Sequence, residues 1–243
     1  MRRIHGAILF RNRDDAGSAL ASKLERYAGR RDVLVFGLPR GGVPVAARVA
    51  ESLAAPLGVL LVRKLGVPGH EEYAMGAIAS GGVVELDEAV VRELRLSPAA
   101  VRAVVLRESE ELARRERVYQ RGRAFPDVRG RTVILVDDGL ATGSTMRAAV
   151  SAVRQHAPAC VVVAVPVASG EACADLSELA DECVCVSRPE PFSAVGAWYE
   201  DFTPTTDAEV LACLDRKPVS GPLSDDARTA RASEGPPGGS SRP

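Results

Sequence analysis

The chain has 243 residues, of which 46% are hydrophobic and 4% aromatic, and its formal net charge is -1. That is enough apolar material for one domain with a small subdomain. The near-zero charge argues against a nucleic-acid partner, and the apolar runs are too short to span a membrane. The start, MRRIHGAILF, lacks the long apolar region of a signal peptide. Five cysteines, an odd number, indicate reduced thiols and a cytoplasmic protein.

Apolar periodicity and turn residues divide the chain into alternating helices and buried strands. In chain order, the pattern predicts a helix over 14–28, a strand over 33–36, a helix over 43–53, a strand over 59–62, a loop with a hairpin over 65–82, a helix over 97–121, a strand over 133–136, a helix over 144–156, a strand over 160–165, a helix over 171–180, a strand over 182–186 and a helix over 207–214.

Strands without polar alternation are typical of parallel sheets that are covered on both faces. Their alternation with helices predicts an α/β fold with a doubly wound, mostly parallel sheet. From Arg216 onward the chain is rich in Pro, Gly, Ser and Arg and has few large apolar residues. We therefore expect one domain over 1–215 and a disordered tail over 216–243.

The stretch VILVDDGLATGST, from Val133 to Thr145, carries the strongest chemical signal. Two carboxylates, Asp137 and Asp138, follow four apolar residues, so they lie at the carboxyl end of a buried strand. Ligands of open parallel sheets bind at that edge. Glycines and hydroxyl residues then lead into a helix, whose first N–H groups are free to bind an anion. The stretch predicts a site for an anionic ligand at this edge of the sheet.

The same stretch resembles the phosphoribosyl-diphosphate signature of type I phosphoribosyltransferases. A second motif, GLPRGG at 37–42, matches the diphosphate loop of that family in its place between a strand and a helix. The chain is also similar to a little-characterised group of bacterial phosphoribosyltransferase-like proteins. It shares with them the pattern FRNRDDAGSALA (10–21) and the motifs PRGGVPVA (39–46) and RKLGVPG (63–69).

The resemblance implies the type I phosphoribosyltransferase fold with a small hood, and a Mg²⁺-dependent transfer of phosphoribose from phosphoribosyl diphosphate to a nucleobase-like nitrogen acceptor. The two carboxylates, Asp137 and Asp138, would bind the ribose hydroxyls and stabilise positive charge at C1. Mg²⁺ would be held mainly by substrate and water. In the family, the diphosphate loop commonly contains a cis peptide. The residues implied to bind the 5-phosphate are Ala141, Thr142, Gly143, Ser144 and Thr145, and those implied to bind diphosphate are Arg40, Gly41, Gly42, Arg63 and Lys64.

Two further segments are weaker candidates. Glu72 and Tyr73 lie where the family has a mobile loop that closes over the site, although exposed loop acids are commonly only solvated. Four of the ten aromatic residues lie between Phe192 and Phe202. Packing against the sheet edge would explain some of these rings, whereas stacking on a planar acceptor would explain Trp198 or Tyr199.

Two functions remain open on the sequence. The first is the transferase. The alternative is a regulatory protein that binds phosphoribosyl diphosphate without turnover. The basic run RRERVYQRGR at 114–123 is typical of the solvated face of a helix, and the alternative interpretation is that it binds RNA. We expect no membrane partner, and the sequence is compatible with a homodimer.

Overall fold

The computed structural model describes residues 2–4, 7–120 and 125–216; all but the first residue of the expected C-terminal tail lies outside this range. The strands are β1 (Arg2–Ile4), β2 (Ala7–Leu9), β3 (Val33–Gly37), β4 (Leu57–Val59), β5 (Val62–Val67), β6 (His70–Ala79), β7 (Val83–Leu86), β8 (Thr132–Val136), β9 (Cys160–Val167) and β10 (Glu182–Ser187). The α-helices are α1 (Arg13–Lys23), α2 (Gly42–Leu53), α3 (Glu88–Glu93), α4 (Pro98–Gln120), α5 (Ser144–Arg154), α6 (Gly170–Leu179) and α7 (Asp207–Leu214). Short 3₁₀ turns cover Glu25–Tyr27 and Val195–Trp198.

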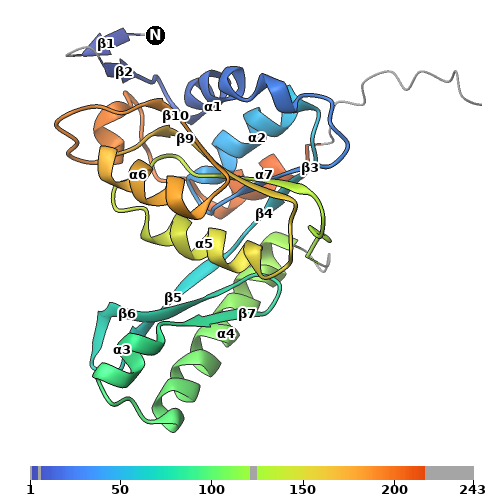
Figure 1. The fold of residues 1–243 in the computed structure, drawn as a ribbon. Coiled ribbons are helices and arrows are strands. Elements are labelled where there is room, and N and C mark those ends of the chain that lie inside the picture. The colour runs from blue at the N-terminus through green and yellow to red at the C-terminus, as the bar shows by residue number, and fades with distance from the viewer. Residues whose placement is uncertain (1, 5–6, 121–124, 217–243) are drawn as a thin grey trace, which may run out of the picture.

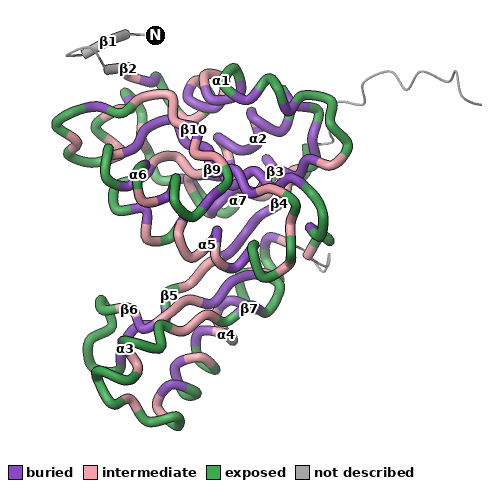
Figure 2. The backbone as a smooth tube through the Cα atoms, viewed as in Figure 1, coloured by how far each residue is buried: buried purple, intermediate pink, exposed green. Residues whose placement is uncertain are grey.

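A five-stranded parallel sheet forms the centre of the molecule, with the strand order β10-β9-β8-β3-β4. Every residue of β3 and β8 is buried, as expected for strands covered on both faces. Helices α1 and α2 pack on one face, and α5 and α6 on the other (Figure 1). Figure 2 shows the buried backbone concentrated between these layers. The doubly wound α/β fold is therefore confirmed.

The strand order places the candidate motifs side by side. β3 and β8 are adjacent in the sheet, with Val33 paired to Thr132 and Gly37 paired to Val136, although the whole small lobe separates them along the chain. From β3 the chain winds to β4 at one edge, and from β8 it winds through β9 to β10 at the other. The sheet therefore has its switch point between β3 and β8, where open α/β sheets form a crevice. The loops after these two strands carry the LPRGG and DDGLATGST segments.

A smaller lobe projects from the sheet edge near β4. It contains the antiparallel sheet β5-β6-β7, together with α3 and the long helix α4 (Figure 1). The sequence predicted a strand over 59–62 and a loop with a hairpin over 65–82. That strand boundary is wrong: β4 ends at Val59 and β5 begins at Val62, so the apolar run VLLV is divided between two sheets. The hairpin forms, and most of the expected loop is strand.

Helix α4 begins as the sequence predicts. The Ser97 hydroxyl accepts the backbone N–H of Ala100 at 3.2 Å, which satisfies one free donor of the first turn. Val101, Val104 and Leu112 are buried on the side that faces the lobe.

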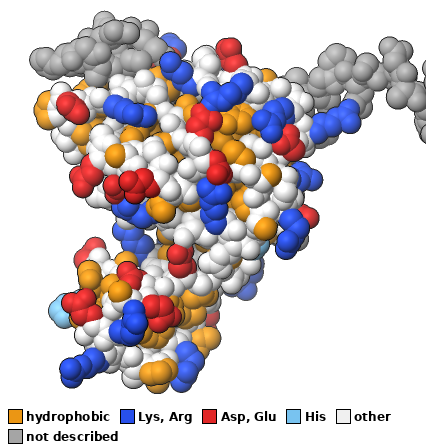
Figure 3. Space-filling view, in the orientation of Figure 1, with side chains coloured by type: hydrophobic (Ala, Val, Ile, Leu, Met, Phe, Trp, Pro, Cys, Tyr) orange, Lys and Arg blue, Asp and Glu red, His pale blue; other side chains and the backbone are white. Residues whose placement is uncertain are grey.

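Acidic and basic side chains are mixed over the molecular face in Figure 3, as a net charge of -1 suggests. Among the described residues, no helix is both long and apolar enough to cross a bilayer.

The segment before α1 pairs with the segment that follows β10. Phe10 pairs with Tyr199: the Phe10 N–H donates to the Trp198 carbonyl at 2.9 Å, and the Glu200 N–H donates to the Phe10 carbonyl at 2.8 Å. Phe10 and Tyr199 belong to a small apolar cluster that also holds Val167 and half-buried Phe202. This pairing fixes the segment after β10 over the carboxyl edge of the sheet.

Candidate functional site

The carboxylate pair lies directly after β8. Oδ1 of Asp137 accepts the backbone N–H of Asp138 at 2.8 Å. Burial raises the pKa of Asp137 well above its ordinary value, and the neighbouring Asp138 charge raises it further. Burial also raises the pKa of Asp138, although an arginine opposes that effect. Two carboxylates that are partly removed from water and lie at a crevice are expected to bind or act on a ligand, and not to serve packing of the core.

The arginine that opposes this shift is Arg13, a residue that the sequence analysis did not assign to the site. Its Nε and Nη2 lie 2.9 and 2.8 Å from Oδ2 of Asp138, and the two side chains are only 12% and 15% exposed. Its Nη1 donates to the Thr203 carbonyl at 2.8 Å, and its guanidinium lies 4.1 Å from the centre of the Phe202 ring. The sequence feature that could have assigned Arg13 to the site is its position in the FRNRDDAGSALA pattern at the start of α1.

The loop after β3 rests on the carboxylate pair. The Pro39–Arg40 peptide bond is cis, which matches the loop geometry that the resemblance implies. A Cβ atom at Gly41 would collide with Oδ2 of Asp138, and one at Gly42 would lie 2.7 Å from the Val136 carbonyl oxygen. Only glycine therefore allows this loop to approach the end of β8 so closely. The Arg40 side chain is 55% exposed and points out of the loop, with Nη1 4.0 Å from Asp207.

The segment from Ala141 to Thr145 forms a turn into α5. Gly143 adopts the left-handed conformation (φ 69°) and is the N-cap of α5, so the cap residue has no side chain to offer, and the Ser144 N–H makes a long contact of 3.5 Å to the Thr142 hydroxyl. The Thr142 hydroxyl lies 3.3 Å from that of Ser144, and the Ser169 hydroxyl fixes the loop by donating to the Ala141 carbonyl at 2.7 Å. Uncapped first-turn N–H groups and clustered hydroxyls form a suitable cradle for a phosphate.

Comparison with known protein families finds a match that covers these motifs. The model of the phosphoribosyl transferase domain matches residues 9–200, a range that includes the carboxylate pair, the glycine loop and the α5 turn. The chain belongs to the phosphoribosyl transferase domain family.

Relatives of this family member share most of its length. A protein found in two strains of Mycobacterium tuberculosis, whose name assigns it provisionally to the phosphoribosyl transferases, is 49% identical over 208 residues. The match covers 86% of this chain and 47% of the relative, so the chain spans about half the length of these curated relatives. The crystal structure of TT1426 from Thermus thermophilus is similar with a TM-score of 0.77 and 45% identity, and the match covers 85% of this chain and 98% of that one.

Two residues that the resemblance implied for diphosphate binding, Arg63 and Lys64, lie inside β5 and not at the end of a parallel strand. The Arg63 Nε donates to Oε2 of Glu108 on α4 at 2.6 Å. Arg63 therefore joins the two elements of the small lobe, and diphosphate would have to compete with that carboxylate. Lys64 is exposed. Of the mobile-loop candidates, Glu72 and Tyr73 lie at the start of β6 next to the hairpin turn, and both are exposed.

The aromatic candidates for acceptor binding take different positions. Tyr199 is 6% exposed, its ring packs on Phe10 and Phe202, and its hydroxyl donates to the Asp138 carbonyl at 2.6 Å. The ring therefore packs against neighbouring rings in this conformation, and the expectation that Tyr199 stacks on an acceptor stays a prediction. Its hydroxyl holds the Asp138 backbone. Trp198 is half-buried, and its indole Nε1 is buried without a hydrogen-bond partner among the described residues.

Proposed function

We propose that the protein transfers the phosphoribosyl group of phosphoribosyl diphosphate to a nitrogen atom of a nucleobase-like acceptor and releases diphosphate. One observation carries the proposal: at the β3–β8 switch point, a carboxylate pair, an uncapped helix start and a closely packed glycine loop meet. These are the three cradles that a ribose, a 5-phosphate and a diphosphate would need. Family membership and the order of these motifs along the chain support it.

In the proposed reaction, the bond between ribose C1 and the diphosphate oxygen breaks as the acceptor nitrogen forms its bond to C1. The electron pair of the broken bond leaves with diphosphate, and the nitrogen gives up its proton to solvent or to a nearby base. While the old bond to C1 is largely broken and the new one is not yet formed, the ribose carries positive charge. Asp137 and Asp138 would accept hydrogen bonds from the ribose hydroxyls and stabilise that charge. Arg13 leaves Oδ1 of Asp138 free for this, because its Nε and Nη2 both contact Oδ2.

The donor set at this edge suits a hard cation such as Mg²⁺. The Asp137 and Asp138 carboxylates supply oxygen ligands, which Mg²⁺ prefers. The described residues contain no group of three or more His, Cys, Asp and Glu side chains that could hold a metal by themselves, so substrate oxygens and water would complete the coordination. When bound, Mg²⁺ would neutralise charge on the departing diphosphate.

For the acceptor, the proposal rests on Trp198. It lies in the segment after β10, which the pairing with Phe10 holds over the carboxyl edge of the sheet. Its buried, unpaired Nε1 is a donor without an acceptor among the described residues, an arrangement that costs free energy unless a ligand or water completes it. An acceptor with a ring nitrogen or carbonyl oxygen would provide that partner.

The test is release of diphosphate from phosphoribosyl diphosphate and Mg²⁺ with a panel of purine, pyrimidine and other nitrogen acceptors. Binding of the donor is measured in parallel by calorimetry. Turnover with any acceptor that disappears in Asp138→Asn supports the transferase. Tight donor binding with no turnover on the whole panel would favour the regulatory alternative. Absence of donor binding would contradict both.

A further inference from the structure

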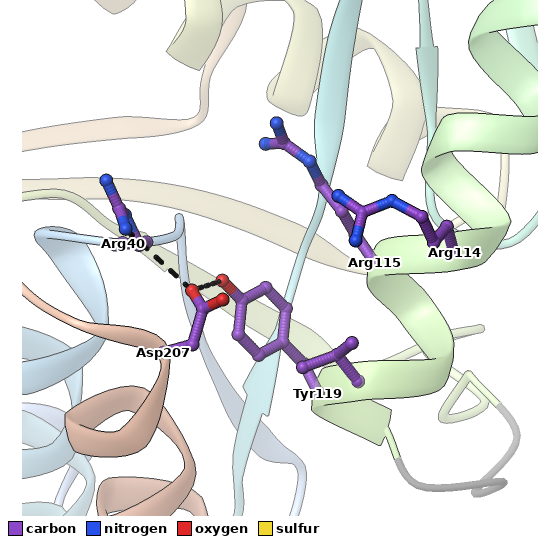
Figure 4. Close-up of a pocket in the computed structure, with 6 residues that line it drawn as sticks. Arg40, Arg114, Arg115, Tyr119 and Asp207 are labelled. Carbon is purple, nitrogen blue, oxygen red and sulfur yellow. Dashed lines mark hydrogen bonds and ion pairs between the residues drawn. The ribbon is translucent and has the colours of Figure 1, made fainter.

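A second polar cleft opens beside the Arg40 loop, outside the carboxylate site. It has a volume of about 290 Å³. Its described lining residues come from the β3–α2 loop, from α4 and from the start of α7: Arg40, Arg114, Arg115, Val118, Tyr119 and Asp207. Figure 4 shows Arg114 and Arg115 on α4 facing across the cleft toward Arg40 and Asp207. The small lobe and the central domain therefore contribute cations to one space.

The arginines of α4 are not neutralised by their neighbours. Arg114 donates to Glu111 through Nε at 2.7 Å and Nη2 at 2.9 Å, and Arg115 donates to the same carboxylate through Nε at 2.9 Å. Arg63 lies 3.8 Å from it as well. Glu111 thus serves both Arg114 and Arg115, whereas the main partner of Arg63 is Glu108. Arg114 and Arg115 remain 61% and 47% exposed, so N–H donors on both are available to a ligand.

On the opposite wall, Asp207 is a fixed negative charge next to Arg40. The Tyr119 hydroxyl donates to Oδ1 of Asp207 at 2.6 Å, and Nη1 of Arg40 lies 4.0 Å from the same oxygen. Burial, followed by the bond to Asp207, raises the pKa of Tyr119 to about 12, so the phenol stays protonated as a donor. At 4.0 Å the Arg40–Asp207 contact is too long for a strong hydrogen bond. Arg40 is therefore available to bind an anion that approaches it more closely than Asp207 does.

We infer that this cleft is a phosphate subsite in which Arg114 and Arg115 of α4 bind a phosphate-bearing anion together with Arg40, while Asp207 is the weak counter-charge of Arg40 in the unliganded protein. Guanidinium forks match phosphate oxygens in pairs, which favours phosphate over a single carboxylate. The inference rests on the proposed function to the extent that Arg40 belongs to the diphosphate loop. The anion has two sources with one chemistry: the diphosphate of the donor itself, or a separate phosphate compound bound beside it.

The experiment measures binding of inorganic diphosphate and of phosphoribosyl diphosphate by calorimetry to the full chain. The variant is Arg114→Gln with Arg115→Gln. The matched control is Arg117→Gln, an exposed arginine on the same helix that does not line the cleft. The double variant should bind diphosphate about tenfold more weakly or worse, as expected for lost hydrogen bonds to a charged group. The control should bind as the parent does. All variants are checked by circular dichroism.

Asp207→Asn provides a test of opposite sign. It removes the competing charge but keeps an oxygen for the Tyr119 hydroxyl, so it should tighten diphosphate binding by roughly two- to fivefold. If phosphate compounds still bind when the donor is saturating, and that binding needs Arg114 and Arg115, the anion is a separate ligand. If they compete with the donor, the anion is the donor's own diphosphate.

Three results would overturn the inference. Unchanged diphosphate affinity in the double variant, with affinity lost in Arg40→Gln, would remove the α4 subsite and leave the proposed function intact. Weaker binding in Asp207→Asn would contradict the counter-charge role. If the parent protein binds neither diphosphate nor the donor, the proposed function fails together with the subsite.

Discussion

Replacing Arg13 by methionine is the sharpest test of how the carboxylate site is built. The change keeps an unbranched apolar stem and removes the guanidinium group with its charge, so Asp138 loses both contacts to its Oδ2, at 2.9 and 2.8 Å. Because the two side chains are only 12% and 15% exposed, water can replace the arginine poorly. Breaking such a buried pair costs about 3–5 kcal/mol. For a domain of this size, each kcal/mol lowers the melting temperature by roughly 2–4 °C, which gives a fall of about 6–20 °C.

The pH dependence of this loss has a defined sign. Burial raises the pKa of Asp138 in the folded protein even with Arg13 present, and removing the arginine must raise it further. A carboxyl group whose folded-state pKa is raised destabilises the fold above its unfolded pKa, and that penalty disappears as the pH falls toward about 4. The deficit of Arg13→Met relative to the parent should therefore shrink on going from about pH 7.5 to about pH 5.

The assay is thermal unfolding of the parent, Arg13→Met, Asp138→Asn and the double variant at several pH values. Asp138→Asn should recover part of the loss caused by Arg13→Met, because the unpaired charge is gone. Arg11→Met is the control, since Arg11 pairs with Asp15 at the surface with its side chain 75% exposed, and it should change the melting temperature little. A melting temperature for Arg13→Met within about 2 °C of the parent, or no recovery in the double variant, would refute the reasoning.

Four further predictions concern the carboxylate site and its surroundings. Asp137→Asn and Asp138→Asn should each slow turnover by a factor that corresponds to about 2.7–4 kcal/mol of barrier while circular dichroism stays unchanged; near-parent rates would place the ribose elsewhere. Because burial raises the pKa of Asp137, the acid limb of the pH–rate profile should lie above the ordinary aspartate range of about 4, and the profile should change in Asp137→Asn. Tyr199→Phe keeps the ring in its cluster but removes the bond to the Asp138 carbonyl, so it should cost about 0.5–1.5 kcal/mol in denaturant unfolding, and an unchanged midpoint would contradict the bond. Arg63→Ala should lower thermal stability through loss of the Glu108 contact, whereas an effect on diphosphate binding alone would support the ligand role that the sequence suggested.

Local patterns in the sequence were sufficient for the central architecture. The strands β3, β8 and β9 are continuous apolar runs, and such runs need no information from distant residues to be recognised as buried strands. The placement of Asp137 and Asp138 after one strand, and of Arg40 after another, then follows from the rule that parallel strands end at one edge. The proximity of these two loops was implied by the family resemblance, and the strand order shows it.

The error in the predicted strand over 59–62 has a physical cause. The run VLLV at 59–62 has the composition of one buried strand, yet β4 ends at Val59 and β5 starts at Val62. Leu60 and Leu61 are buried between the two strands, at 0% and 3% exposure, so apolar composition does not distinguish a strand from the passage between two sheets. Only the positions of the partner strands decide where hydrogen bonding stops.

By itself, the sequence determined the fold class, the order of elements and the residues that follow each strand at the carboxyl edge, because these depend on short-range periodicity and on the geometry of parallel sheets. Only the tertiary structure decided which side chains pair across the chain. Arg13 reaches Asp138 over 125 positions, and Tyr199 reaches the same residue over 61. An arginine or a tyrosine has the same local pattern whether it meets solvent, a ligand or a buried carboxylate, so its role depends on which distant segment folding brings to it.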